Sequence, residues 1–101
     1  MYNLFFSCRL SNRDLTEIDS TLFNQLTSLQ CLDISQNQLT DIPHDLRLPK
    51  LQILDVANNQ LQNVNFVKNF KNLREFYIEE NPQLKVVFIS PKCPDDSVMY
   101  L

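Results

Sequence analysis

The chain has 101 residues, of which 44% are hydrophobic and 21% are charged, and its formal net charge is −3. This composition is typical of one globular domain; it excludes a disordered chain and lacks the basic stripe that general nucleic-acid binding requires. No run approaches the roughly 20 apolar residues of a membrane span, and the complete absence of glycine excludes glycine-rich phosphate-binding loops.

Cysteine and histidine usage predicts neither a disulfide scaffold nor a metal centre. Cys8, Cys31 and Cys93 are an odd number without dense spacing, and no cysteine stands at metal-ligand spacing from another or from His44. None of the eleven asparagines lies in a glycosylation sequon, and the opening MYNLFFSCRL lacks the basic start of a signal peptide. We therefore expect an intracellular, reducing compartment, no cofactor, no metal ion and no membrane contact.

A leucine-rich pattern recurs along the chain at a fixed interval. LQCLDISQNQL occupies 29–39, LQILDVANNQL occupies 51–61 and LREFYIEENPQ occupies 73–83, with starts 22 residues apart. This is the signature L-x-x-L-x-L-x-x-N-x-L, in which each repeat supplies one strand and buries its apolar edge against its neighbours. The sequence predicts an α/β repeat fold: a short leucine-rich-repeat solenoid with four parallel strands on the concave face and irregular or short helical convex segments.

A degenerate repeat precedes the clear ones. Phe5, Cys8, Leu10 and Leu15 take its apolar positions, and Arg13 stands where the later repeats carry asparagine. The repeats thus start near residues 5, 29, 51 and 73, and we expect strands over 7–10, 31–34, 53–56 and 75–78.

The convex segments differ in their helix signals. In the first, Ile18, Leu22, Phe23 and Leu26 recur at helix-like intervals and predict a turn or two of helix. In the second, Pro43 and Pro49 exclude a long helix. The third spaces its apolar residues three apart, at Val64, Val67 and Phe70, which favours a short 3₁₀ or α segment.

The pattern weakens after the fourth strand. Leu84 stands one place late, KVVFIS reads as a possible extra strand, and PKCPDDSVMYL contains no repeat. We assign residues 1–84 to the leucine-rich-repeat domain and 85–101 to a divergent, poorly capped tail.

Two sets of residues are candidates for a role. Stacked repeats place Asn37, Asn59 and Asn81 in a column, a structural ladder whose side chains bond backbone groups that would otherwise be buried unpaired. The residues that alternate outward from the strands form the second set, the predicted partner-binding surface of the concave face: Arg9, Asp33, Ile53, Asp55, Glu75, Tyr77 and Glu79. Its acidity suits a basic peptide, with Tyr77 available for a cation–π contact and Ile53 as an apolar anchor.

An enzyme is the rival class. Asp33 and Asp55 would lie on neighbouring strands and form a carboxylate pair of the kind some hydrolases use. An open strand face gives no closed pocket, and no nucleophile or histidine stands nearby, so we expect no catalytic residues and no enzyme activity. A secreted or receptor domain is disfavoured because it would lean on cysteine-rich caps.

From LTSLQCLDIS through ANNQLQNV to FKNLREFYIEENPQL, the chain resembles the amino-terminal leucine-rich region of the leucine-rich-repeat and WD-repeat proteins that associate with the origin recognition complex. The shared features are the short second convex segment DLRLPKL, ANNQL and the E-x-NP-x-L ending. The resemblance covers about three-fifths of the chain. It implies a nuclear chromatin adaptor whose partners are origin-recognition subunits or histones, with a WD-repeat propeller downstream. This chain has no WD repeat, so we expect a fragment or truncated product. A cytoplasmic adaptor or a phosphatase regulator built from similar repeats remains the alternative.

Overall fold

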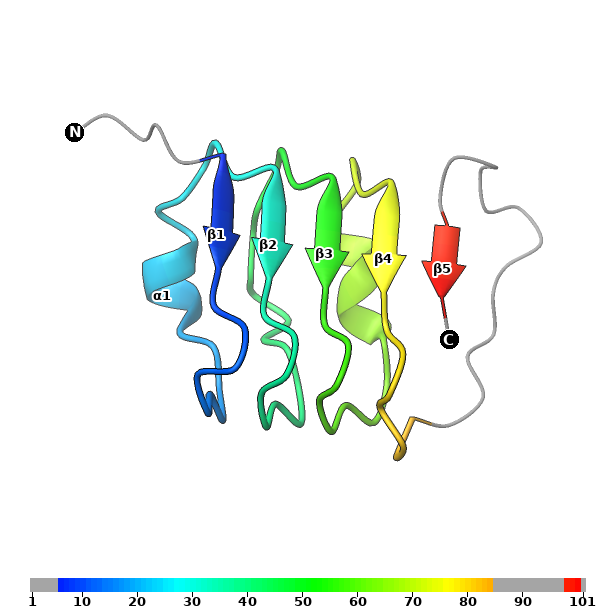
Figure 1. The fold of residues 1–101 in the computed structure, drawn as a ribbon. Helices are drawn as coiled ribbons and strands as arrows, with labels where there is room; N and C mark the ends of the chain where they lie inside the picture. The colour runs from blue at the N-terminus through cyan, green and yellow to red at the C-terminus, as the bar shows by residue number, and fades with distance from the viewer. Residues whose placement is uncertain (1–5, 85–97, 101) are drawn as a thin grey trace.

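The structure is a computed structural model that describes residues 6–84 and 98–100. Its strands lie side by side in one parallel sheet, and two short helices lie behind the sheet (Figure 1). The elements in chain order are β1 (Ser7–Arg9), α1 (Ser20–Phe23), β2 (Cys31–Asp33), β3 (Ile53–Asp55), the 3₁₀ helix η1 (Asn65–Asn69), β4 (Glu75–Tyr77) and β5 (Val98–Tyr100). The order of strands in the sheet follows the order in the chain, so each strand pairs with its neighbours in sequence.

The four strands predicted from the repeat are present, each one residue shorter than expected at its carboxyl end. Parallel strands need a crossover connection. Between β1 and β4 each crossover is one of the convex segments, which are called return segments from here on. The pairing keeps one register, in which Cys8, Leu32, Leu54 and Phe76 lie opposite one another on successive strands. The register is the same for the first interval of 24 residues and for the later ones of 22, because the two extra residues lie in the first return segment and not in the motif.

The hydrophobic core lies between the sheet and the return segments. Leu32, Ile34, Leu54 and Val56 are at most 1% exposed, as the motif predicts. The flanking motif leucines are also fully buried; they are Leu29, Leu39, Leu51 and Leu61. The corresponding residues of the first repeat are only partly buried against this core, since β1 has a neighbouring strand on one side; they are Cys8, Leu10 and Leu15.

The first return segment contains the one-turn helix α1. Asp19 caps its amino-terminal end, where the Oδ1 atom accepts hydrogen bonds from the backbone N–H groups of Thr21 and Leu22. Phe23 is buried, whereas Leu22 is 58% exposed. A helix this short turns only one of two adjacent residues toward the core, and here that residue is Phe23.

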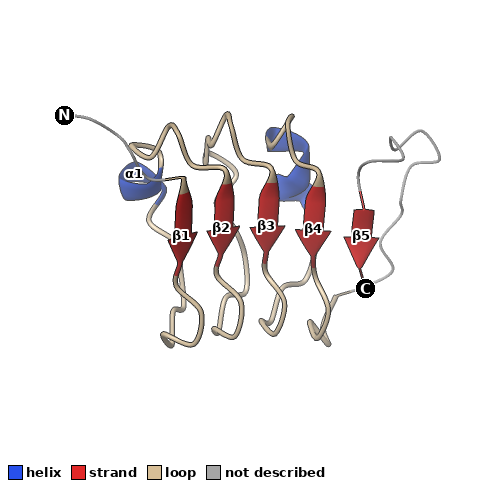
Figure 2. Cartoon of the chain, turned by 45° about the horizontal axis from the view of Figure 1, so that its top comes forward, coloured by secondary structure: helices blue, strands red, loops and turns tan. Residues whose placement is uncertain are grey.

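The second return segment forms no helix, in keeping with its two prolines. The third contains η1, which lies on the same side of the sheet as α1 (Figure 2). Its deepest residue is Phe66, which packs edge-to-face against Phe76 of β4 with ring centroids 5.9 Å apart. Phe70 is buried as expected, but Val64 and Val67 are only partly buried.

The fifth strand was not predicted. β5 comes from the divergent tail and pairs in parallel with β4, so the described sheet has five strands rather than four. The KVVFIS segment lies outside the described residues. The boundary of the repeat domain at residue 84 and the poor capping of the tail stay predictions.

Candidate protein-interaction surface

The strand side chains that do not enter the core form one continuous surface, the outer strand face. Its members are Ser7, Arg9, Cys31, Asp33, Ile53, Asp55, Glu75 and Tyr77. The register sets them in two rows across strands about 4.8 Å apart. Six of the seven residues predicted to bind a partner therefore lie together. The seventh, Glu79, is half-buried two residues beyond β4.

Asp33 and Asp55 hold the turns that follow their strands. Asp33 Oδ1 accepts hydrogen bonds from Ser35 N at 3.0 Å and from Ser35 Oγ at 2.6 Å. Asp55 Oδ1 accepts one from Ala57 N at 3.0 Å. A carboxylate that bonds the backbone N–H two residues further on fixes a turn. The two aspartates thus have a structural role that sequence reasoning missed, although the aligned DIS and DVA pieces place each aspartate two residues before a small residue.

Negative charge is concentrated around Asp55 on β3, the middle strand of the described sheet. Burial raises the pKa of the Asp55 carboxyl group, and the hydrogen bond from Ala57 N partly opposes this effect. The charges of Asp33 and Glu79 raise the pKa of Asp55 further. Ionised Asp55 is therefore held at a free-energy cost that a nearby cation would reduce.

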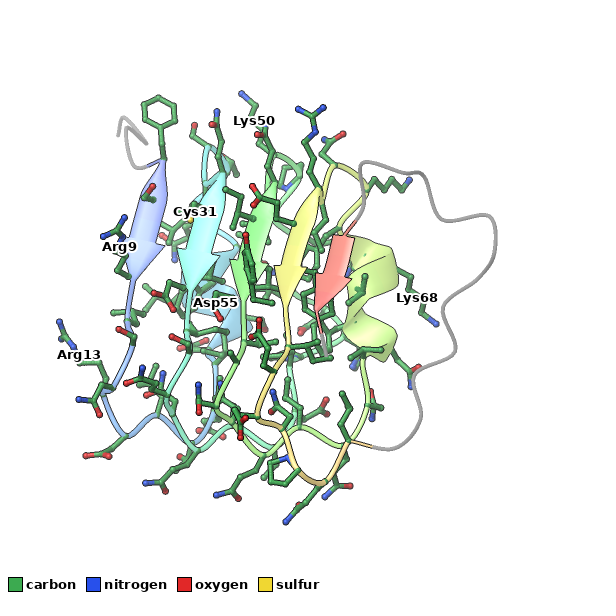
Figure 3. The ribbon with its side chains drawn as sticks, turned by 45° about the vertical axis from the view of Figure 1, so that its right-hand side comes forward. Arg9, Arg13, Cys31, Lys50, Asp55 and Lys68 are labelled. Carbon is green, nitrogen blue, oxygen red and sulfur yellow. The ribbon has the colours of Figure 1, made fainter. Side chains whose placement is uncertain are left out.

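The thiol of Cys31, on the adjacent strand β2, is affected by the same carboxylates. Burial raises the pKa of Cys31, and the cation of Arg9 lowers it. The carboxylates of Asp33, Asp55 and Glu75 each raise the pKa of Cys31. Arg9 lies on β1 at the edge of the face, away from Asp55 at its centre (Figure 3). Two titratable groups on adjacent strands thus both respond to a surplus of negative charge.

An aromatic residue and an aliphatic one complete the face. The Tyr77 hydroxyl donates a hydrogen bond of 2.6 Å to Glu75 Oε1, which fixes the ring on β4. Ile53 is half-buried and lies between Cys31 and Glu75, its register partners on the two neighbouring strands. The surface therefore offers apolar area next to carboxylates.

The asparagines of the motif lie beneath this face, at the carboxyl ends of the strands. The Nδ2 group of Asn59 donates to the carbonyl oxygens of Ile34, Val56 and Ala57 at 3.0–3.2 Å. Its Oδ1 atom accepts from Leu39 N at 2.9 Å. One side chain thus bonds its own repeat and the preceding one.

The same pattern holds on both sides of Asn59. Asn81 Oδ1 accepts from Leu61 N at 3.0 Å. Asn37 Oδ1 accepts from the N–H groups of Arg13 and Leu15, both at 3.0 Å. All three asparagines are at most 8% exposed. Within residues 6–84, no buried side-chain nitrogen or oxygen lacks a hydrogen-bond partner.

The residue before each asparagine position adopts a left-handed backbone conformation. These residues are Asn12, Gln36, Asn58 and Glu80, with φ between 55° and 58°. A residue other than glycine costs about 1–2 kcal/mol in this backbone region, and among the others asparagine adopts the conformation most readily. The chain has no glycine, so two of the four repeats meet this demand with the favoured residue and two do not. The motif alone gives no signal of it.

The carboxylate pair raised as a rival catalytic site lies on an open part of this surface. Asp33 and Asp55 are half-buried on the open strand face, and two surface hollows of the described residues are lined by return segments instead. Among residues 6–84, no cluster of three histidine, cysteine or carboxylate side chains is placed to hold a metal ion. No helix of the described chain is long and apolar enough to cross a bilayer. Cys8 and Cys31 are both free thiols, on opposite faces of the sheet.

Comparison with known proteins identifies the family. The family described as leucine-rich repeat and WD repeat-containing protein 1, LRR, matches residues 5–94. The leucine-rich repeat and WD repeat-containing protein 1 of Xenopus laevis is 45% identical over 73 residues, which are 72% of this chain and 10% of that protein. The same protein of Xenopus tropicalis is 41% identical over 73 residues, 72% of this chain and 11% of its own length. The chain thus spans about a tenth of these relatives, and it belongs to the leucine-rich-repeat family of leucine-rich repeat and WD repeat-containing protein 1.

Proposed function

We propose that this domain is a non-enzymatic protein-interaction module, a short repeat solenoid whose outer strand face holds a basic peptide segment of its partner. The observation that carries the proposal is the set of carboxylates that the strand register brings together at the centre of the face, Asp33, Asp55 and Glu75, each of which raises the pKa of Cys31. Tyr77 and Ile53 supply the adjoining aromatic and aliphatic contacts.

The test must separate charge from fold. Replacing Asp33 and Asp55 by lysine would remove the oxygen atoms that fix two turns, so lost binding would not be interpretable. Asparagine in their place keeps an Oδ1 acceptor for Ser35 N and Ala57 N while removing the charge. The double variant Asp33→Asn/Asp55→Asn is therefore the informative one.

The measurement is the affinity for a labelled lysine- and arginine-rich peptide, by fluorescence anisotropy. Each exposed charge pair contributes about 0.2–1 kcal/mol, so the double variant should bind about two- to thirtyfold more weakly. Asp14→Asn/Glu17→Gln is the matched control, since it changes the net charge equally at exposed residues off the outer strand face. Equal weakening by both pairs would show that only net charge matters.

The finer assignment is the partner. We propose a nuclear adaptor of chromatin, with origin-recognition subunits and histone tails as the partners to test, on the strength of the family resemblance and the basic character of histone tails. Pull-down of purified origin-recognition subunits and of histone peptides with wild-type protein and with Asp33→Asn/Asp55→Asn would decide. Capture that survives the double substitution would place the contact elsewhere on the domain.

A further inference from the structure

The third return segment, together with the end of the second, carries an excess of positive charge. Between residues 46 and 74 the sequence has five lysine and arginine residues and a single carboxylate, Asp55, which lies on the outer strand face. Lys68 projects from η1, away from the strands that carry Asp55 and Cys31 (Figure 3). The strand face around Asp55 and the return segments between residues 46 and 74 therefore differ in the sign of their charge.

Two adjoining hollows shape this positive region. One, of about 630 Å³, is lined by residues that include Arg47, Lys71 and Asn72. The other, of about 440 Å³, is lined by residues that include Arg47 and Lys68. Both share Arg47 and Asn69, so the two form one continuous trough between the return segments. Of the residues that line it, Asp41 alone is acidic.

Hydrogen bonds between repeats fix the floor of the trough. Asn69 Nδ2 donates to His44 O at 2.8 Å, and Asn72 Nδ2 donates to Pro49 O at 2.7 Å. Arg47 Nη1 donates to His44 O at 2.9 Å, which holds the guanidinium group against the backbone. Lys68 and Lys71 remain exposed at the rim. A floor that is already fixed by these hydrogen bonds suits an extended ligand, because its side chains lose little further freedom on binding.

We propose that this trough binds an acidic peptide segment of a second partner, independently of the outer strand face. Glutamate and aspartate side chains would pair with Arg47, Lys68 and Lys71, and the asparagine amides would face the peptide backbone. Single-stranded nucleic acid fits less well, because it is held by stacking on exposed aromatic rings. The aromatic residues of this region, Phe66 and Phe70, are 3% and 4% exposed.

The proposal is tested with a labelled glutamate- and aspartate-rich peptide and the whole chain. Lys68→Gln/Lys71→Gln removes two rim cations that are exposed, and it should weaken binding about two- to thirtyfold, the equivalent of two exposed charge pairs. The control for charge removal compares Lys68→Gln with Arg13→Gln, because Arg13 is an exposed cation of the first repeat that belongs neither to the trough nor to the outer strand face. Arg13→Gln should bind like wild type, and in wild type the peptide should shift the side-chain amide resonances of Asn69 and Asn72.

Three results would overturn the proposal: no peptide binding by wild type, equal loss in Lys68→Gln and Arg13→Gln, or tighter Lys68-dependent binding of a single-stranded oligonucleotide of the same charge. The last would assign the trough to nucleic acid. Since Lys68 and Lys71 lie off the outer strand face, a failure here leaves the basic-peptide site untouched, and the reverse holds for Asp33→Asn/Asp55→Asn.

Discussion

The first repeat and the three that follow share one backbone plan but differ in how it is completed. Asn37, Asn59 and Asn81 each bond the loop of the repeat before them. The first repeat has Arg13 at this position, and its own loop is bonded by Asn37. Because no described repeat precedes it, an asparagine there would have no earlier loop to bond. The loss of the motif asparagine at the start of the stack is thus consistent with the direction of the hydrogen bonds.

The largest expected difference between the first repeat and the central ones concerns the core. Leu54→Ala should lower the free energy of unfolding by about 2–5 kcal/mol, because a side chain that is 1% exposed leaves a cavity. A domain of this size has only about 5–15 kcal/mol in total. Cys8→Ala, at the same register position in β1, should cost about 1 kcal/mol or less. Urea unfolding of both variants measures the difference; similar midpoints would mean that the edge repeat is as well packed as the centre.

The next effect concerns the asparagine position itself. Asn59→Ala leaves Leu39 N and buried carbonyl groups without their partner and should cost about 1–3 kcal/mol. Arg13→Ala removes an exposed side chain and should change stability by no more than about 0.5 kcal/mol. Equal losses in thermal or urea unfolding would contradict a structural role for the asparagine column.

A smaller effect on stability concerns the residue of each repeat that has a left-handed backbone conformation. Gln36→Asn places the best-tolerated side chain at φ 55° and should stabilise the protein by up to about 1 kcal/mol. Asn58→Gln makes the reverse change at φ 56° and should destabilise by a similar amount. Both residues are exposed, so packing changes little. Shifts of the same sign in the two variants would count against backbone strain as the cause.

The smallest effect is the dependence of stability on pH. The pKa of Asp55 is raised above its ordinary 3.8 by burial and by neighbouring carboxylates, so the folded protein binds a proton there more readily than the unfolded chain. The free energy of unfolding should therefore fall as pH rises from 3.8 through the raised value, and stay lower above it. Asp55→Asn should lack this slope and be no less stable than wild type at neutral pH. Urea unfolding across acid pH, with Glu17→Gln as control, tests it; an unchanged slope in Asp55→Asn would assign it to another group.

Periodicity was enough to predict the four repeat strands, their parallel pairing and the buried leucines. The motif alone fixes those features, because the same motif position returns to the same layer after 24 residues in the first repeat and after 22 in the next two. Alternation of side chains along the strands also puts Cys8 and Cys31 on opposite faces of the sheet. The core could therefore be named residue by residue from the motif.

Features that depend on local hydrogen bonds could not be predicted in this way. Asp33 and Asp55 point outward whether they bind a partner or fix a turn, so alternation does not distinguish the two roles. β5 pairs with β4 through backbone groups, which have no side-chain signature. Leu22 fits a helical interval, but the helix ends after one turn. In each case the deciding feature does not recur in every repeat, so the motif gives no signal of it.

The direction of the asparagine bonds has a consequence for how the chain is made. Asn37 lies 22 residues after Leu15, and Asn59 lies 20 after Leu39. A repeat leaving the ribosome therefore keeps loop N–H groups bonded to water until most of the next repeat has emerged. The loop of each repeat gains its hydrogen bonds only from the next repeat. The growing stack therefore always has, at its carboxyl end, one unfinished layer whose loop lacks these bonds. Removing a repeat from the carboxyl end recreates that unfinished layer, whereas removing the first repeat leaves the loops of the second and third repeats bonded.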